Sequence, residues 1–419
     1  MRGWPRGPGE AVDTVRAGPL HGVQVLDLSR VLAGPFATMG LGEMGARVVK
    51  GEHVRGGDET RNWGPPFIGG ESAYYLAVNR NKEGVALDLG HEAAQVAVRR
   101  LAVAWADIVV ENFLPGTLEK FGLGLDSLRA EQPRLITASV RGYPPGDDRP
   151  GYDFVIQGAG GIMSITGPQD GDPFKIGVAA TDLFAGMFLQ SGLLAALYDR
   201  ERTGLGQHLE VSLFDAQLAM LANVASASLV TGRTPRRYGN AHPQLAPYEV
   251  FACEDGRITI GVGNDRQFAA LSQALGHPGW AEDDRFRHNA DRVVRRQELV
   301  ALMQDVLAAR SCAAWLRELT VAGVPCGPIR TVDEALASPE AELSGAVVHM
   351  DHPTVPDLQQ VRLPWRFSRR CAAPRTPPPL HGEHTRQVLA EAGLDEAAID
   401  AAIGNGAALQ ADQVRSASP

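Results

Sequence analysis

The chain has 419 residues, of which 44% are hydrophobic and 21% charged, and this length and composition predict a soluble globular protein of two domains. Its formal net charge of −9, without any Lys/Arg cluster, argues against nucleic acid as a partner. Its four cysteines lie far apart with no C-x-x-C pair, which argues against a zinc site or a disulfide framework and suits a reducing, cytoplasmic location.

The first elements in chain order predict a βαβ unit. Residues 1–18 are rich in Pro, Gly and Arg and lack the apolar core of a signal peptide, so we interpret them as a disordered extension or an overlong start. A short apolar strand over 22–28 is followed by a turn at 29–35, a helix over 36–45 and a second strand over 46–50. Strand, turn, helix and strand in so short a stretch are typical of a parallel sheet.

Strands and helices continue to alternate up to residue 140. We expect strands over 84–89, 107–112 and 134–140, with helices over 92–105 and 117–130. These elements predict a large Rossmann-like α/β domain, in which a ligand crevice lies outside the carboxyl ends of the strands. The chain carries no G-x-G-x-x-G after its first strand and no G-x-x-x-x-G-K-[ST], so neither a dinucleotide nor a triphosphate site is predicted.

A single acid, Asp182, stands where an apolar helix is expected to begin. It follows the small-residue run at 177–180 and precedes residues 183–197, which are nearly free of charge. One interpretation is an N-cap, since Asp accepts hydrogen bonds from the first free N–H groups of a helix. The other is a nucleophile, with helix-end N–H groups near enough to stabilise an oxyanion. No apolar run, this one included, reaches the roughly 18 residues of a membrane span, so no membrane partner is expected.

The second half of the chain predicts a smaller domain and then a return to the first. A strand over 208–213 precedes a hairpin with an Asp-Gly turn over 248–260, and strand-like segments recur at 347–366 before a helix over 384–392. The predicted organisation is a large domain over 19–215, a linker helix over 216–232, a small domain over 233–330, a return to the large domain over 331–395, and a C-terminal helix and tail over 396–419.

Familiar catalytic patterns are absent from the sequence. Two pairs of histidines spaced three apart lie in polar loops rather than on one helix face, so no metal site is predicted. No G-x-S-x-G occurs, and the adjacent acids Asp147 and Asp148 are interpreted as solvated. Asp182 and Asp153 remain as candidates for chemistry.

Several short motifs stand in a fixed order along the chain. They are Ser29-Arg-Val-Leu-Ala-Gly-Pro, Asn79-Arg-Asn-Lys, Val110-Glu-Asn-Phe-Leu-Pro-Gly, Arg149-Pro-Gly-Tyr-Asp, Thr181-Asp-Leu-Phe-Ala-Gly, Arg202-Thr-Gly-Leu-Gly-Gln, Asn240-Ala-His-Pro, Gly323-Val-Pro-Cys-Gly-Pro and Pro377-Pro-Pro-Leu-His-Gly-Glu-His-Thr. Together they resemble the family III CoA-transferases, also called the CaiB/BaiF family, over residues 19–395.

The resemblance implies that Asp182 is the catalytic nucleophile. In that family the carboxylate attacks an acyl-CoA thioester to give a mixed anhydride and CoA thiolate. The thiolate then returns to form an aspartyl-CoA thioester, and an acceptor carboxylic acid reverses the steps. Coenzyme A thioester is then a substrate, with no permanently bound cofactor and no metal. Acyl exchange between two thioesters is near thermoneutral, which agrees with the missing ATP motifs.

The same resemblance implies where CoA binds. The expected contacts are Val31, Leu32 and Ala33 along the first turn, Asn112, Phe113 and Lys120 near the adenine and phosphate end, and Arg141 and Tyr152 beside the pantetheine. Some members carry Gln at the position of Leu32 and Arg at that of Lys120. Lys keeps the charge of Arg but loses its bidentate fork. Some members also have a glycine-rich flap, whereas the matching residues 239–247 here lack a run of glycines.

Three other functions are weighed against CoA transfer. A 2-methylacyl-CoA racemase of the same fold family uses a His directly before Asp153, and this chain has Tyr152 there, a poor base at neutral pH. An NAD(P) oxidoreductase is disfavoured by the absent glycine fingerprint. A non-catalytic CoA-binding protein would have no need of Asp182.

Within the family the chain is similar to the succinate–hydroxymethylglutarate (glutarate) CoA-transferases. The shared runs are Arg30-Val-Leu-Ala-Gly-Pro-Phe-Ala-Thr-Met39, Trp63-Gly-Pro-Pro-Phe67, Tyr74-Tyr-Leu-Ala-Val-Asn-Arg-Asn-Lys82, Gly261-Val-Gly-Asn264 and His352-Pro-Thr-Val355. This similarity suggests succinyl-CoA or another dicarboxylic acyl-CoA as donor. The family's architecture implies a small domain inserted in the large one, and two protomers that interlock as a homodimer.

Overall fold

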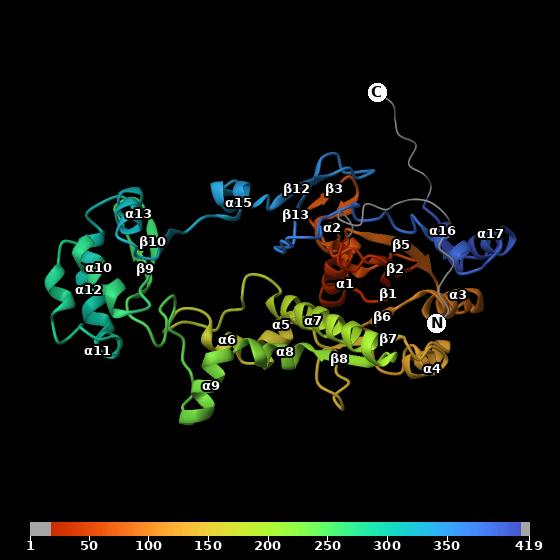
Figure 1. The fold of residues 1–419 in the computed structure, drawn as a ribbon, viewed down its shortest axis with the longest axis horizontal. Helices are drawn as coiled ribbons and strands as arrows, with labels where there is room; N and C mark the ends of the chain where they lie inside the picture. Colours follow the sequence, from red (N-terminus) through yellow and green to blue (C-terminus); the bar gives the residue numbers. More distant parts are fainter. Residues whose placement is uncertain (1–17, 412–419) are drawn as a thin grey trace. The chain divides into compact units, whose positions relative to one another are not determined.

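A seven-stranded sheet organises the larger part of the protein (Figure 1). The computed structural model describes residues 18–411, so the extension predicted over 1–18 lies outside the described residues except for Gly18. The strand order is β14-β5-β2-β1-β6-β7-β8. Every neighbouring pair is parallel except β14 with β5. The fold is therefore mixed α/β with a mainly parallel large sheet. The strands are β1 (Gln24–Asp27), β2 (Arg47–His53), β5 (Lys82–Leu87), β6 (Ile108–Glu111), β7 (Ile136–Arg141), β8 (His208–Ser212) and β14 (Ala408–Leu409).

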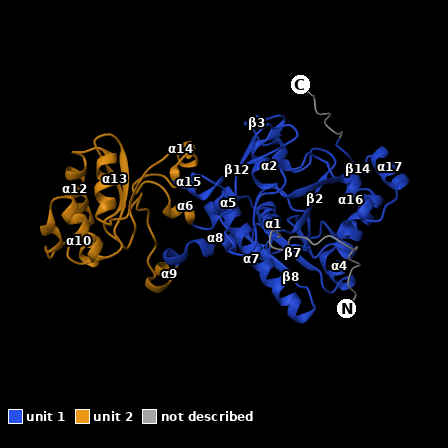
Figure 2. Cartoon of the chain, turned by 45° about the horizontal axis from the view of Figure 1, so that its top comes forward, with its two compact units in different colours: residues 1–161, 177–225, 340–419 blue, residues 162–176, 226–339 orange. Residues whose placement is uncertain are grey.

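The described chain separates into two compact units (Figure 2). Of the described residues, unit 1 contains 18–161, 177–225 and 340–411, and unit 2 contains 162–176 and 226–339. The helices of unit 1 are α1 (Ala33–Glu43), α2 (Ala73–Val78), α3 (Glu92–Arg100), α4 (Leu125–Glu131), α5 (Asp153–Ala159), α7 (Ala180–Thr203), α8 (Leu213–Met220), α16 (Thr385–Glu391) and α17 (Glu396–Gly404).

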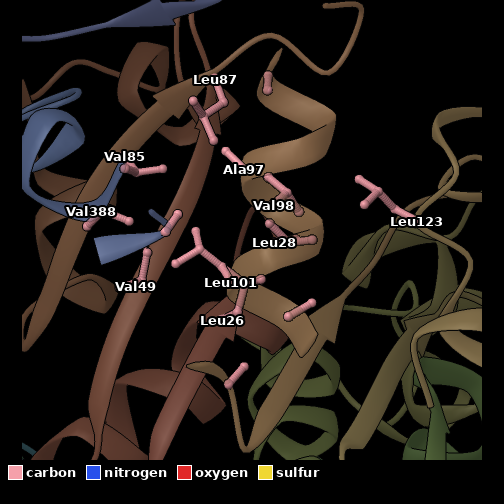
Figure 3. Close-up of a cluster of buried hydrophobic side chains, with 14 of the residues drawn as sticks. Leu26, Leu28, Val49, Val85, Leu87, Ala97, Val98, Leu101, Leu123 and Val388 are labelled. Atoms are coloured by element: carbon pink, nitrogen blue, oxygen red, sulfur yellow. The ribbon is translucent and has the colours of Figure 1, made fainter. Parts of the chain in front are cut away.

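Side chains from both faces of the large sheet are buried, as expected for parallel strands covered on two sides. Along β1, Leu26 joins one apolar cluster and Val25 the other, because successive side chains of a strand point to opposite faces. In the first cluster Leu26, Val49 and Val85 of the sheet pack with α3 and with Val388 of α16 (Figure 3). The second cluster joins the sheet to α1, α7 and α8.

Helix α7 packs closely on α1, because small residues line their contact. A Cβ built on Gly186 would lie 2.7 Å from the carbonyl oxygen of Ala33, so only glycine allows this approach. With 24 residues and a mean hydropathy of 1.4 in its most apolar stretch, α7 is by length and composition able to span a membrane. This differs from the expectation that no apolar segment is long enough for a span. Packing inside unit 1 accounts for Ala185, Leu189 and Leu193, which are fully buried.

Unit 2 has its own core around a three-stranded antiparallel sheet. The order is β11-β10-β9, from β9 (Tyr248–Ala252), β10 (Arg257–Gly261) and β11 (Cys326–Pro328), and the predicted hairpin is therefore present. The helices of unit 2 are α6 (Ile162–Ile165), α10 (Asp265–Ala274), α11 (Asn289–Val294), α12 (Arg296–Leu307), α13 (Cys312–Val321) and α14 (Val332–Leu336), while α9 (Ala222–Thr231) and α15 (Pro339–Ser344) lie at its boundaries.

Several predicted elements differ from the observed ones. The helix expected over 117–130 is a short 3-10 turn (Glu119–Phe121) followed by α4, because Gly122 takes a left-handed conformation between them. The helix expected over 92–105 is α3 continued by a π turn (Leu101–Trp105). Strand-like residues 347–366 form a separate hairpin, β12 (Val347–Met350) with β13 (Leu358–Val361), and the edge strand β14 was not predicted. A second small hairpin pairs β3 (Phe67–Ile68) with β4 (Glu71–Ser72).

Candidate active site

A cavity of about 270 Å³ opens in unit 1 where the carboxyl ends of β1, β6 and β7 meet. This position agrees with the rule for open parallel sheets. Most residues predicted from the sequence to form the site line this one cavity. They are Val31, Leu32, Ala33, Asn112, Phe113, Arg141, Tyr152 and Asp182. Lys120 is not among the lining residues; it is exposed in the 3-10 turn before α4.

Asp182 is the third residue of α7 and does not cap the helix. The helix begins at Ala180, three residues earlier than the sequence predicted, and Ala179 at the N-cap position makes no side-chain bond. The N-cap interpretation of Asp182 is therefore wrong. The cap comes instead from Asp153 at the start of α5, whose Oδ1 accepts the N–H of Thr181 at 2.8 Å and of Asp182 at 3.4 Å.

This arrangement also changes the expected oxyanion site. The N–H groups of Thr181 and Asp182 are bound to Asp153, and that of Ala180 is bound to the carbonyl of Val178 at 2.8 Å. These first N–H groups of α7 are consequently already occupied. Gln157 donates to the other oxygen of Asp153 at 2.7 Å and fixes the capping carboxylate in place.

The electrostatic surroundings of Asp182 favour its protonated form. Burial raises its pKa to about 7, and the nearby negative charge of Asp153 adds to the rise. The residue is only 8% exposed although it lines the cavity. A carboxylate near pH 7 that has lost most of its hydration is a stronger nucleophile than a solvated one, and it still ionises at neutral pH. Burial also raises the pKa of Tyr74, helped by the charges of Asp182 and Asp153.

The turn between β1 and α1 forms one wall of the cavity. Its residue Val31 has φ +70°, a left-handed conformation that costs a β-branched residue about 1–3 kcal/mol. Neighbouring side chains hold this turn. Asn112 accepts the N–H of Arg30 at 2.9 Å and donates to its carbonyl at 2.8 Å, while Asp58 accepts the N–H of Val31 at 3.2 Å.

Arg141 and Phe113 are fixed at the wall formed by β6 and β7. The guanidinium of Arg141 lies 2.8 Å from Glu111 and donates to the carbonyl of Phe113 at 2.8 Å. The guanidinium of Arg30 lies over the ring of Phe113, with its Cζ 5.2 Å from the ring centre. Tyr152, at 59% exposure, is the residue before α5 and borders the cavity with its ring largely open to solvent.

The structure adds lining residues that the sequence did not single out as site residues. Arg149 pairs with Asp147 at 2.6 Å and stacks on Tyr143, and both members of the pair line the cavity. Asp147 is therefore paired rather than simply solvated, which corrects the sequence interpretation. Arg30 and Glu59 also line the cavity and pair at 2.6 Å. The Arg149-Pro-Gly-Tyr-Asp motif was the only signal pointing to Arg149.

Residues 239–247, which match the family's flap but lack its run of glycines, belong to unit 2. His242 receives the N–H of Gln244 on its Nδ1 at 3.0 Å and packs against Tyr248, with ring centres 5.3 Å apart. Its carbonyl accepts a hydrogen bond from Arg296 at 2.5 Å. These contacts are those of an ordered loop histidine. Among residues 18–411, no group of three or more His, Cys, Asp or Glu side chains is placed to hold a metal ion.

Comparison with known proteins decides the family. Residues 20–385 match the family described as CoA-transferase family III. The chain belongs to CoA-transferase family III. It is 40% identical over 407 residues to the succinyl-CoA:glutarate CoA-transferase of Mus musculus, a match that covers 96% of this chain and 93% of that protein. It is 42% identical over 389 residues to the succinate–glutarate CoA-transferase of Agrobacterium fabrum, covering 90% and 96%.

A solved structure has the same fold. The crystal structure of a CaiB/BaiF family protein from Brucella suis superposes with a TM-score of 0.80 at 42% identity, covering 90% of this chain and 100% of that one. The resemblance to family III, and within it to the glutarate CoA-transferases, is thereby confirmed.

For this member of CoA-transferase family III, the geometry supplies a buried carboxylate in a cavity lined by charged side chains of both signs. Asp182 lies at the helix start, while Arg30, Arg141 and Arg149 line the same cavity. All three guanidiniums are paired with carboxylates of this chain. An anionic substrate therefore meets a wall in which cations are already oriented, and binding would exchange some of these ion pairs for pairs with the substrate.

Proposed function

We propose that this protein transfers CoA from succinyl-CoA, or another dicarboxylic acyl-CoA, to a free carboxylic acid. The observation that carries the proposal is the buried carboxylate of Asp182, with a pKa of about 7, in a cavity whose lining includes all the residues expected to contact CoA except Lys120. The names of the relatives from Mus musculus and Agrobacterium fabrum support succinyl and glutaryl groups as the acyl groups exchanged.

The proposed reaction has four steps through Asp182. Its carboxylate oxygen attacks the thioester carbon, so a C–O bond forms as the C–S bond breaks and CoA thiolate leaves. The thiolate then attacks the aspartyl carbon of the anhydride and releases the donor as a free carboxylate. The acceptor carboxylate attacks the carbonyl carbon of the resulting aspartyl-CoA thioester, so a second mixed anhydride forms as the C–S bond breaks and CoA thiolate leaves. Finally the thiolate attacks the acceptor's acyl carbon, giving the new acyl-CoA and regenerating the carboxylate. Each step exchanges one activated acyl bond for another, which divides one hard exchange into easier ones.

CoA is proposed to lie along the β1–α1 turn as a substrate, with no permanently bound cofactor. Val31, Leu32 and Ala33 would contact it there, and Asn112 and Phe113 would lie toward the adenine. Arg141 and Tyr152 would border the pantetheine. Lys120, outside the lined cavity, would reach only the phosphate end. The exposed ring of Tyr152 and the paired Arg141 support these roles.

The test is a panel of acyl-CoA donors and free acids incubated with the purified protein, with products read by mass spectrometry. Exchange between succinyl-CoA and glutarate is expected, and its loss in Asp182→Ala. Asp126→Ala is the matched control, because Asp126 is an acid of unit 1 with a side chain 94% exposed. Incubation with succinyl-CoA alone should leave a CoA adduct on the wild-type protein and none on Asp182→Ala. Full exchange by Asp182→Ala would refute the mechanism, and no exchange with any dicarboxylate would refute the substrate class.

We also propose an interlocked homodimer with the small domain inserted into a Rossmann-like large domain, located in the cytoplasm. Large apolar side chains exposed on α5 and α7 support a partner surface, since monomers rarely expose such patches. They are Phe154, Val155, Phe184, Met187 and Phe188. The four free cysteines support a reducing compartment. Light scattering tests the dimer, and cell fractionation tests the location.

A further inference from the structure

Two fully buried lysines bind the two ends of residues 29–35, the segment that contains the β1–α1 turn and the first residues of α1. Nζ of Lys50, on β2, donates to the carbonyl of Ser29 at 2.9 Å. Nζ of Lys82, on β5, donates to the carbonyl of Pro35 at 2.9 Å. Both side chains have 0% exposure. Together they fix the first and last residues of the segment that carries Val31 along the cavity.

Each lysine is paired with a buried carboxylate. Lys82 lies 2.9 Å from Asp27, and Lys50 lies 2.9 Å from Asp58. Burial works against the charge of Lys50, but Asp58 and other acids more than offset it and raise the pKa of that lysine. The pKa of Asp58 is lowered although burial opposes it, with Lys50 as the main cause. The Lys50–Asp58 pair is consequently charged.

Asp58 connects this pair to the backbone of the turn. Both of its carboxylate oxygens lie 3.2 Å from the N–H of Val31, and Oδ1 also accepts from the N–H and hydroxyl of Thr60. Val31 is the residue with φ +70°. A valine adopts that conformation only when its surroundings determine it. The bond from its N–H to a buried carboxylate is such a determinant.

A role in stability alone does not explain this layout. Replacing a buried ion pair by apolar residues often leaves stability unchanged or improved, so such a pair is weak evidence for a stabilising role. In this network the ammonium groups and one carboxylate bind backbone atoms of residues 29–35, and Arg30 to Ala33 of that segment line the cavity containing Asp182. The network thus determines the shape of a cavity wall.

We propose that Asp58, oriented by Lys50, is a positioning residue that holds Val31 in its left-handed conformation and so shapes the CoA-binding wall before substrate arrives. This inference rests on the proposed CoA-transferase function. It adds a residue that acts through Val31 without contacting the substrate.

Asp58→Asn tests the proposal, because the amide keeps one acceptor oxygen but loses the charge that binds Lys50. Loss of a charge-assisted hydrogen bond should raise KM for succinyl-CoA about 10-fold or more, with a smaller change in kcat. Glu43→Gln is the matched control. Glu43 is as buried as Asp58 and pairs with buried Arg80, but neither residue lines the cavity. The Glu43→Gln variant should be less stable than the wild type but show no comparable rise in KM.

The double variant Asp58→Asn/Val31→Gly separates positioning from general damage. Glycine reaches φ +70° without a steric penalty, so the KM of the double variant should be lower than that of Asp58→Asn alone. The proposal would be overturned if KM were unchanged in Asp58→Asn. It would also be overturned if the rise in KM of the double variant equalled the combined rises of Asp58→Asn and Val31→Gly. Thermal unfolding of each variant checks that it is folded.

Amide hydrogen exchange on the wild-type protein gives a second measurement that needs no variant to fold. Exchange in the peptide covering residues 29–33 should already be slow without CoA and change little when CoA binds. Fast exchange that becomes slow only with CoA would contradict a preset turn. A wild-type protein that transfers no CoA would refute the proposed function but not the preset turn, because amide hydrogen exchange measured without CoA reports on the turn alone.

Discussion

Asp153 caps the helix that carries Asp182, although the two acids are 29 residues apart. The Oδ1 of Asp153 accepts the N–H of Asp182 at 3.4 Å and that of Thr181 at 2.8 Å. A carboxylate used as a cap thus also adds to the rise in the pKa of Asp182. It stabilises the start of α7 while making ionisation of Asp182 harder.

The rate of CoA transfer should depend on pH through Asp182. In the proposed mechanism only the ionised carboxylate attacks the thioester, and its pKa is raised to about 7, mainly by burial. We therefore expect kcat/KM for succinyl-CoA to rise tenfold per pH unit below pH 7 and to level off above it. A pH series at saturating acceptor measures this rising limb of the curve of kcat/KM against pH. A rate that is already constant between pH 5 and 8 would contradict it.

Asp153→Asn should move this limb to lower pH. The amide oxygen can still accept the N–H of Thr181, so the cap persists, but the negative charge beside Asp182 is gone. The shift should be only part of the whole rise, because burial is its larger cause. Gln157 donates to Asp153 and can turn its own amide to suit Asn. The same pH series measures the shift, and a limb that stays in place would show that the two acids are not coupled.

Asp182→Asn should make the folded protein more stable above pH 4. For a carboxyl whose pKa rises from 3.8 unfolded to about 7 folded, the native state binds more protons in that window, so stability falls as pH rises from 4 to 7. The amide removes this loss, worth on the order of a few kcal/mol at pH 8. Urea unfolding of both proteins at pH 4 and pH 8 measures it. A difference that does not grow between the two pH values would contradict the raised pKa.

Much of this fold could be predicted because its signals are local. Apolar strand segments, a turn after β1 and the Asp-Gly hairpin of unit 2 are each readable within a few residues, and each element is observed. The beginning of the helix predicted over 117–130 was wrong because Gly122 interrupts a segment of helical composition, so the helix starts only at Leu125. The two-residue strand β14 is too short to leave a pattern.

The site could be predicted less completely, because its decisive contacts join distant parts of the chain. Asp182 was found, but its role as a cap was wrong, since the cap comes from Asp153 on another helix. Lys50 and Lys82 stand in strands where charge would ordinarily be read as exposed, and only the fold brings their partners to them. A charge inside a strand pattern is the signal that would have drawn attention to them.

The contact between α7 and the β1–α1 turn gives the last prediction. A Cβ on Gly186, one turn after Asp182, would lie 2.7 Å from the carbonyl oxygen of Ala33, a backbone atom that cannot move alone. Gly186→Ala should therefore separate α7 from the turn and lower kcat/KM at least 10-fold, although alanine favours the helix by up to about 1 kcal/mol. Gly192→Ala on the same helix is the control, because its Cβ would meet the side chain of Leu209, which can change rotamer. Thermal unfolding and kcat/KM of both variants decide the matter: equal activity in the two would show that the spacing between the turn and α7 does not govern transfer.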